Sequence, residues 1–270
     1  MCRVLEVSRS GYYDWFDRPE SMRAKRHREL TVKIRQAHIE SRKIYGSPRI
    51  HGELVDQGEK VGKNTVACLM RRANIQSRVH KRFVVTTDSR KTKQPADNIL
   101  DCDFTSEHPN QKWVSDVTYI PTRKGWLYLS AIMDLYSRLI VGWSMGESNN
   151  TELVEAALKM ATTNRRNFQG VILHSDQGVQ YASTSYQQLL IDLSMICSMS
   201  RKGNCWDNAP MESFFHSLKT EWVVFEDYKT RSEARASLFD YIEFFYNRKR
   251  RHSALKYRSP LAFEIAGGVP

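Results

Sequence analysis

The sequence predicts an α/β fold, a mixed five-stranded sheet with flanking helices, preceded by a small all-α domain. Three observations support this fold class. Apolar residues recur at helical spacing in three short segments between residues 21 and 76. From residue 112 onward, three β-rich segments follow one another, and helical and strand patterns then alternate. The chain has 270 residues, which is enough for two separate cores.

The helical domain has the pattern of a helix-turn-helix. Leu30, Ile34 and Ala37 fall on one face of a first helix. Ser47, followed by proline, is a favourable start for a second short helix. A third helix is expected over residues 63–73, after a turn that contains glycine. A DNA-binding role for this unit competes with a role as a protein–protein module.

The α/β domain is expected to begin with a three-stranded meander. Its strands are predicted at residues 112–120, 126–134 and 139–144. A helix, a strand, a helix and a strand are expected next, at residues 151–163, 171–175, 183–190 and 195–198. Two further helices are expected at residues 209–221 and 231–247, the second burying Ala234, Leu238, Tyr241, Ile242 and Phe245.

These patterns divide the chain into four parts. Residues 1–20 begin abruptly and resemble the tail of an upstream segment. Residues 21–76 form the helix-turn-helix domain, and residues 77–108 form a basic linker. Residues 109–270 form the α/β core with a helical, basic C-terminal extension.

Charge makes a nucleic acid the expected partner. The chain has 41 Lys and Arg against 30 Asp and Glu, a net charge of +11. The net charge is about +12 in residues 1–95, about −5 in residues 96–230 and about +4 in the remainder. An acidic centre between basic flanks indicates a central segment whose task requires carboxylates.

Cysteine usage and hydropathy narrow the class of protein. The five cysteines are odd in number and none forms a C-x-x-C pair, so neither a zinc site nor a redox dithiol is expected. The most apolar stretch is far too short to span a membrane, and no secretory signal is evident. The sequence therefore predicts a cytoplasmic protein with no membrane partner.

Three carboxylates in the acidic centre are candidate catalytic residues. Asp116 lies within a predicted strand, where an acid facing a dry core would be costly. Asp176 ends a buried apolar strand, the position at which open α/β sheets bind ligands. Glu212 lies in the first turn of a predicted helix, where an acid with a purely structural role would interact favourably with the helix dipole. Taken singly, each carboxylate is also explained by a structural role.

Three converging carboxylates require a cation. Two ionised carboxylates about 4 Å apart repel by about 4 kcal/mol at an effective dielectric constant of 20. Oxygen ligands without a cysteine–histidine cluster favour magnesium or manganese over zinc. Two such ions would activate an attacking water or hydroxyl and stabilise the leaving oxygen in phosphoryl transfer on nucleic acid. Asp116, Asp176 and Glu212 are therefore both the catalytic and the metal-ligand candidates.

The spacing of these acids and the surrounding motifs resemble a known family. Thirty-five residues separate Asp176 from Glu212, which matches the D, D(35)E pattern of transposases and integrases. The motifs resemble those of the second-frame product (OrfB) of IS-three family insertion sequences, over nearly the whole chain. They include WVSDVTY from residue 113, GWLYL from residue 125, HSDQG from residue 174, the tripeptide Asp-Asn-Ala from residue 207 and ESFF from residue 212, with YNR and RH near the C-terminus.

The resemblance implies an RNase H-like catalytic core and a DNA transposase that cleaves and joins strands at the ends of a mobile element. It implies two divalent metal ions, double-stranded DNA at the terminal repeats and target, and a homo-multimer on DNA. A first-frame product, or a frameshift fusion with it, is the expected protein partner. The sequence departs from the family pattern at Cys102 and Gln177, each a position where arginine is common, and both changes could weaken DNA contacts.

Three further polar residues are candidates for the site, and two of them, Asp134 and His174, also have a structural interpretation. Asp134 could replace Asp116 as a ligand, but a turn cap paired with Arg138 explains it equally well. His174 could orient the site, but a hydrogen-bonded core histidine is the simpler reading, and His216 could approach the scissile phosphate.

The DNA-binding candidates lie on four parts of the chain. They are Lys63, Asn64, Arg71 and Arg72 on the third helix, Lys202 and Asn204 in the loop before Glu212, Lys219 two turns after Glu212, and Arg248 and Arg251 in the C-terminal basic run. Lys219 is also explained as an exposed lysine near a helix C-terminus. The basic run is also explained as a solvated tail. The rival functions are a nuclease of the same fold and a DNA-binding regulator that does not cut.

Overall fold

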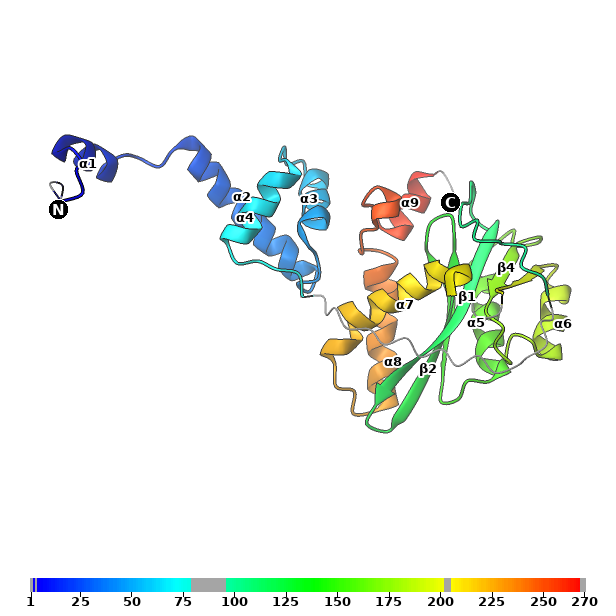
Figure 1. The fold of residues 1–270 in the computed structure, drawn as a ribbon. Helices are drawn as coiled ribbons and strands as arrows, with labels where there is room; N and C mark the ends of the chain where they lie inside the picture. The colour runs from blue at the N-terminus through cyan, green and yellow to red at the C-terminus, as the bar shows by residue number, and fades with distance from the viewer. Residues whose placement is uncertain (1, 3, 79–95, 202–204, 268–270) are drawn as a thin grey trace. The chain divides into compact units, whose positions relative to one another are not determined.

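The computed structural model describes residues 2, 4–78, 96–201 and 205–267, and the chain divides into two compact units, residues 1–78 and 79–270 (Figure 1). The first unit is entirely helical and the second is built on a mixed sheet. The fold class predicted from the sequence is therefore confirmed. No helix among the described residues is long and apolar enough to cross a membrane.

The helical unit contains the three predicted helices and one more. The predicted ones are α2 (Met22–Glu40), α3 (Ser47–Asp56) and α4 (Lys63–Arg72), whose apolar faces bury Leu30, Ile34, Ala37, Ile50, Leu54, Val66, Leu69 and Met70. The additional helix is α1 (Arg9–Phe16), within the segment interpreted as an upstream tail. Ser8 caps its first turn, and the helix has no buried residue. Local capping, rather than burial, accounts for it.

The turn between α3 and α4 is fixed by side chains. Gly58 ends α3 with φ of 84°, a conformation that favours glycine. The His51 Nε2 atom lies 3.0 Å from the Val61 carbonyl, and Glu59 forms ion pairs with Arg26 and Lys33 of α2. The turn is therefore held by side chains of both α2 and α3.

The sheet has five strands in the order β3-β2-β1-β4-β5. The strands are β1 (Lys112–Thr122), β2 (Gly125–Asp134), β3 (Ile140–Gly146), β4 (Ile172–Ser175) and β5 (Ile196–Met199). The first three form an antiparallel meander, whereas β4 and β5 run parallel to β1. The sequence placed the end of β1 too early: the strand continues through Pro121, because Pro121 pairs with Trp126 and the Thr122 hydroxyl closes the turn onto Gly125.

Helices cover both faces of this sheet (Figure 1). Helices α5 (Thr151–Asn164) and α6 (Thr184–Asp192) cover one face, and their apolar residues form a core with Trp113, Ile132 and Leu173. Helices α7 (Ala209–Glu221) and α8 (Arg231–Phe239) lie on the other side of the sheet and contact β1. Short 3₁₀ turns precede and follow α7, at Cys205–Asn208 and Val223–Phe225.

The C-terminal extension differs from the single helix that the sequence predicts. Helix α8 ends at Phe239, and a π-helical segment, η3 (Asp240–Tyr246), continues it. All five residues predicted to be buried are buried. The wider winding lets neighbouring rings Phe245 and Tyr246 both pack inward, Phe245 against Trp222 and Tyr246 against Phe214. A 3₁₀ turn, η4 (Ser253–Leu255), and α9 (Pro260–Ala266) complete the chain.

Candidate active site

The pairing of β1 with β4 places two of the predicted carboxylates side by side. Val114 is the parallel partner of His174. Asp116 and Asp176 each follow these partners by two residues, so they occupy equivalent positions in the register, Asp116 within β1 and Asp176 directly after the end of β4. Side chains two residues apart on a strand share a face, which places both carboxylates on the same face of the sheet.

The pleat explains how β1 tolerates an acid. Trp113 and Val117 pack into the α5–α6 core, so Asp116 points to the opposite face. The Asp116 carboxylate accepts a hydrogen bond from the Val117 backbone N–H at 2.7 Å. On the core side, the hydroxyls of Ser115 and the buried Tyr181 lie 2.9 Å apart. The strand is therefore held on both sides of the acid.

Helix α7 begins beside Asp116 and carries Glu212 in its first turn. Asn208, the residue that precedes the helix, donates from Nδ2 to the Ser115 carbonyl at 3.1 Å. This contact ties the start of α7 to β1 next to Asp116. The Glu212 side chain is exposed.

A buried aspartate organises the approach to α7. Asp207 accepts hydrogen bonds from Arg201, whose guanidinium lies 2.9 Å away, from Asn98 and from the Cys102 thiol. Burial opposes ionisation of Asp207, but the hydrogen bonds from Arg201 outweigh it and lower the pKa to about 2. The sequence identified Asp207 only as part of a helix start. Cys102, one of the departures from the family pattern, belongs to this protein network.

The charges of Asp176 and Glu212 both act on Asp116. Burial, together with the negative charges of Asp176 and Glu212, raises the pKa of Asp116 well above its ordinary value. Burial likewise raises the pKa of Asp176 against the effect of a 3.0 Å hydrogen bond from Gly178, and the pKa of Glu212 is raised by its own partial burial. Such raised values are typical of carboxylates held close together without a counter-ion.

The donor set fits hard divalent cations only in part. Asp116 and Asp176 offer carboxylate oxygens at one place, and oxygen is the ligand that magnesium and manganese prefer. However, no three His, Cys, Asp or Glu side chains in the described ranges form a group that could hold a metal ion. The pair of aspartates therefore fits a cation, whereas Glu212 stands near the pair without completing a three-ligand group.

Lys219 lies close to this site rather than in open solvent. Its Nζ atom is 4.8 Å from the centroid of the Tyr119 ring, and the side chain is half-buried. Burial lowers the pKa of Lys219, and the charge of Asp116 opposes that effect. The reading of Lys219 as an exposed helix-end lysine is therefore wrong.

The structure gives the other polar candidates different partners. The buried Asp134 caps the turn after β2, as expected, because its carboxylate accepts hydrogen bonds from the backbone N–H groups of Asn110 and Tyr136. Arg138 meets Asp134 through its backbone N–H, whereas the charged partner of the carboxylate is Arg165, at 3.8 Å. His174 is buried with its Nδ1 atom 2.9 Å from the Ser198 hydroxyl, and burial lowers its pKa to about 4. His174 is therefore a hydrogen-bonded core histidine, which was the simpler of its two interpretations.

The predicted DNA contacts are placed as follows. Lys63, Asn64, Arg71 and Arg72 are exposed on α4, Arg248 is exposed with its guanidinium 5.9 Å from the centroid of the Phe244 ring, and Arg251 donates to the Tyr257 carbonyl. Lys202 and Asn204 lie outside the described residues. Gln177 donates to the Ser200 carbonyl, and His216 is exposed.

The reading of the C-terminal basic run as a solvated tail is wrong for Arg250. Its guanidinium is buried and binds both carboxylate oxygens of Glu221, at 2.7 and 2.8 Å. The sequence offered one signal for this, since Arg250 lies four residues after the buried Tyr246, within reach of the same helical face.

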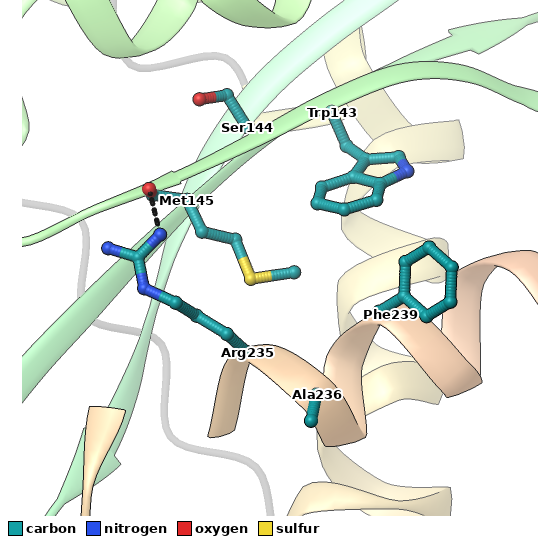
Figure 2. Close-up of a pocket in the computed structure, with 6 residues that line it drawn as sticks. All are labelled: Trp143, Ser144, Met145, Arg235, Ala236 and Phe239. Carbon is teal, nitrogen blue, oxygen red and sulfur yellow. Dashed lines mark hydrogen bonds between the residues drawn. The ribbon is translucent and has the colours of Figure 1, made fainter. Parts of the chain in front are cut away.

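A hollow of about 510 Å³ lies away from the carboxylates, between β3 and α8 (Figure 2). Arg235 reaches across it and donates to the Met145 carbonyl at 2.6 Å, while Trp143 and Phe239 form an aromatic wall. Arg235 thus satisfies a backbone acceptor at the edge of the sheet.

Comparison with known proteins agrees with this arrangement. An integrase core domain model matches residues 106–205, a second integrase core domain model matches residues 212–266, and an HTH-like domain model matches residues 25–83. The solved structure of a simian T-cell lymphotropic virus intasome with a PP2A regulatory subunit is similar in fold. Its TM-score is 0.50 at 12% identity, over 84% of this chain and 73% of that one. These matches define the class: an integrase-core protein with a helix-turn-helix-like domain.

Closer relatives define the family. A 31 kDa protein of insertion element IS600 from Shigella sonnei is 43% identical over 263 residues, 97% of each chain. The transposase InsF of insertion sequence IS3A from Escherichia coli K12 is 41% identical over 266 residues, 98% of this chain and 92% of the relative. The chain belongs to the family of IS3-type insertion-sequence transposases, which act in DNA transposition and integration.

Proposed function

We propose that this protein cleaves DNA strands at the ends of an insertion sequence and joins them to target DNA, with Asp116, Asp176 and Glu212 as the catalytic carboxylates. The observation that carries the proposal is the register of β1 and β4, which gives Asp116 and Asp176 equivalent positions on neighbouring strands. The influence of Glu212 on the pKa of Asp116 supports the third assignment.

The same carboxylates are the proposed ligands of two divalent metal ions, magnesium or manganese. When bound, such ions neutralise charge and lower the pKa of a reacting water or hydroxyl. Asp116 and Asp176 would hold them, and Glu212 would join after a rotation of its exposed side chain. Burial, and for Asp116 also the charges of Asp176 and Glu212, raise these pKa values, and a bound cation would stabilise the ionised carboxylates.

The chain's own residues would orient the DNA. Asn208 fixes the start of α7, which carries Glu212, on β1 next to Asp116, and Lys219 would supply a positive charge for a phosphate next to the reacting one. Hydrolysis frees a 3′-hydroxyl, which then attacks a phosphodiester of the target and displaces its 3′-oxygen. Each step exchanges one P–O bond for another and requires no covalent protein intermediate.

The proposed partners follow from the same chemistry. The exposed polar residues of α4 would read the terminal repeats in double-stranded DNA. Because two ends must be joined to one target, we propose that the protein acts as a homo-multimer on DNA. A first-frame product or a frameshift fusion with it would add a further DNA-binding segment.

A strand-joining assay with labelled element ends tests the proposed function. With magnesium or manganese, and with the first-frame product both present and absent, the protein should release a labelled 3′ end and transfer it to plasmid DNA. Release without transfer would indicate a nuclease of the same fold. Binding without release would indicate a regulator.

Lys219→Gln should slow joining on the order of tenfold and leave Tm within a few degrees of wild type. The ring contact that it loses is worth only about 0.5–1 kcal/mol at a partly exposed site, whereas the lost charge faces the bound DNA. Lys229→Gln, at an exposed lysine, is the matched control. Normal joining by Lys219→Gln, accompanied by a lowered Tm, would assign Lys219 a structural role.

Arg72→Gln should weaken binding to all duplexes alike and reduce the slope of log Kd against log salt by about one unit, as for one lost phosphate contact. Arg72 is exposed at the end of α4, and Arg35→Gln, at an exposed arginine of α2, is the control. An unchanged slope for Arg72→Gln would favour the protein–protein reading of this domain.

A further inference from the structure

A second cavity, of about 320 Å³, lies between α7 and the C-terminal extension. Its polar lining consists of Arg138, Ser213, Ser217, Tyr246, Arg250 and His252, with one further serine on the extension. None of the residues that line it in the described part of the chain is acidic. The lining itself therefore contributes hydrogen-bond donors and two arginines but no carboxylate, and the carboxylate that pairs with Arg250, that of Glu221, lies outside the lining.

Arg138 is the arginine of this lining that has no charged partner among the described residues. The turn after β2 holds its backbone, whose N–H donates to the Asp134 carbonyl at 2.8 Å. Its guanidinium makes no hydrogen bond or ion pair with any described residue, although the side chain is partly buried. Burial lowers the pKa of Arg138 below its ordinary value. A guanidinium has five N–H donors, and withdrawing them from water without an acceptor costs free energy.

The neighbouring charges are already engaged. Arg250 is held by Glu221 and also donates to the Ser217 hydroxyl and to His252 Nε2, at 2.9 and 3.2 Å. Asp134, the acid whose charge reaches Arg138, is bound by two backbone N–H groups and by Arg165. The surrounding residues thus form a fixed wall, and the guanidinium of Arg138 remains available to a ligand.

We propose that this cavity binds a phosphate group of the DNA backbone, with Arg138 as the principal contact and the Ser213 hydroxyl beside it. The planar fork of arginine matches two oxygens of a phosphate, and a cavity of this size admits a small anion with water. Ser213 follows Glu212 directly on α7, so a phosphate bound here would fix the catalytic helix against the DNA strand. The proposal rests on the proposed function, because it takes DNA as the ligand.

The test uses the full chain and two probes, inorganic phosphate and a duplex DNA of arbitrary sequence. Phosphate should raise the Tm of the wild type but not that of Arg138→Gln. The same variant should lower the slope of log Kd against log salt by about one unit on duplex DNA. Arg166→Gln, which removes an equal charge from an exposed arginine of the same unit, should match the wild type in both measurements.

A second variant protects the test against misfolding. Ser213→Asp keeps Arg138 and places a carboxylate at the exposed edge of the cavity. It should therefore also abolish the rise in Tm with phosphate and lower the slope of log Kd against log salt. Equal behaviour of Arg138→Gln and Arg166→Gln in both titrations would overturn the proposal. Loss of the phosphate response with an unchanged DNA slope would overturn it as well, by assigning the cavity to free phosphate.

The strand-joining assay separates this proposal from the proposed function. If the wild type joins strands and Arg138→Gln retains the full slope, only the cavity assignment fails. If the wild type does not join strands but the two titrations depend on Arg138, only the proposed function fails.

Discussion

Asp176→Asn is expected to reduce strand cleavage and joining by on the order of a thousandfold or more, while Kd for DNA stays within a few-fold of wild type. The substitution keeps the size of the side chain and its hydrogen-bond acceptor for Gly178, but it removes the charge that a divalent cation needs. The basic surface that holds DNA is unchanged. Asp116→Asn and Glu212→Gln should behave alike. The measurement is product formation from labelled ends in magnesium.

Asp192→Asn is the matched control, because it removes the same charge from an exposed acid at the end of α6. It should cleave and join at the wild-type rate. More than a trace of magnesium-dependent joining by Asp176→Asn would contradict the assignment of the carboxylates.

A second expected result for Asp176→Asn concerns stability and does not depend on DNA. Folded-state pKa values raised above those of the unfolded chain mean that ionised Asp116 and Asp176 reduce stability at neutral pH, and that this cost disappears as the pH falls. Without metal, Asp176→Asn should therefore be at least as stable as the wild type. Added magnesium or manganese should raise the Tm of the wild type and leave that of Asp176→Asn unchanged.

Glu221→Gln is expected to lower the free energy of unfolding by about 3–5 kcal/mol, because it leaves the buried Arg250 without its counter-charge. Burial alone would lower the pKa of Arg250, but the charge of Glu221 raises it above its ordinary value. For a domain of this size the loss corresponds to a fall in Tm of roughly 10 °C. Thermal unfolding monitored by circular dichroism measures it.

An exposed pair provides the comparison. Arg123 and Asp227 form an ion pair in which both side chains are more than half exposed, so Asp227→Asn should leave the free energy of unfolding almost unchanged. The double variant Glu221→Gln, Arg250→Gln should be more stable than the sum of the two single effects predicts. An equal cost for Glu221→Gln and Asp227→Asn would show that the buried pair does not stabilise the fold.

The sequence by itself determined the order of the elements and the candidate carboxylates. Periodicity located α2, α3, α4 and the five strands, because each element buries one face at a spacing fixed by its own geometry. The spacing of the acids and the motifs around them indicated the family. These features are local, and a linear pattern records them.

The tertiary structure decided which side chains meet. That Arg250 pairs with Glu221, that Asp134 is bound to Arg165 rather than Arg138, and that Lys219 packs over Tyr119 are contacts between elements far apart in the chain. The π-helical continuation of α8 is of the same kind, since it follows from the packing of its rings against those of α7 and the residue after it. A charge in the sequence has many possible partners, and only the packed fold selects one, because burial makes an unpaired charge costly.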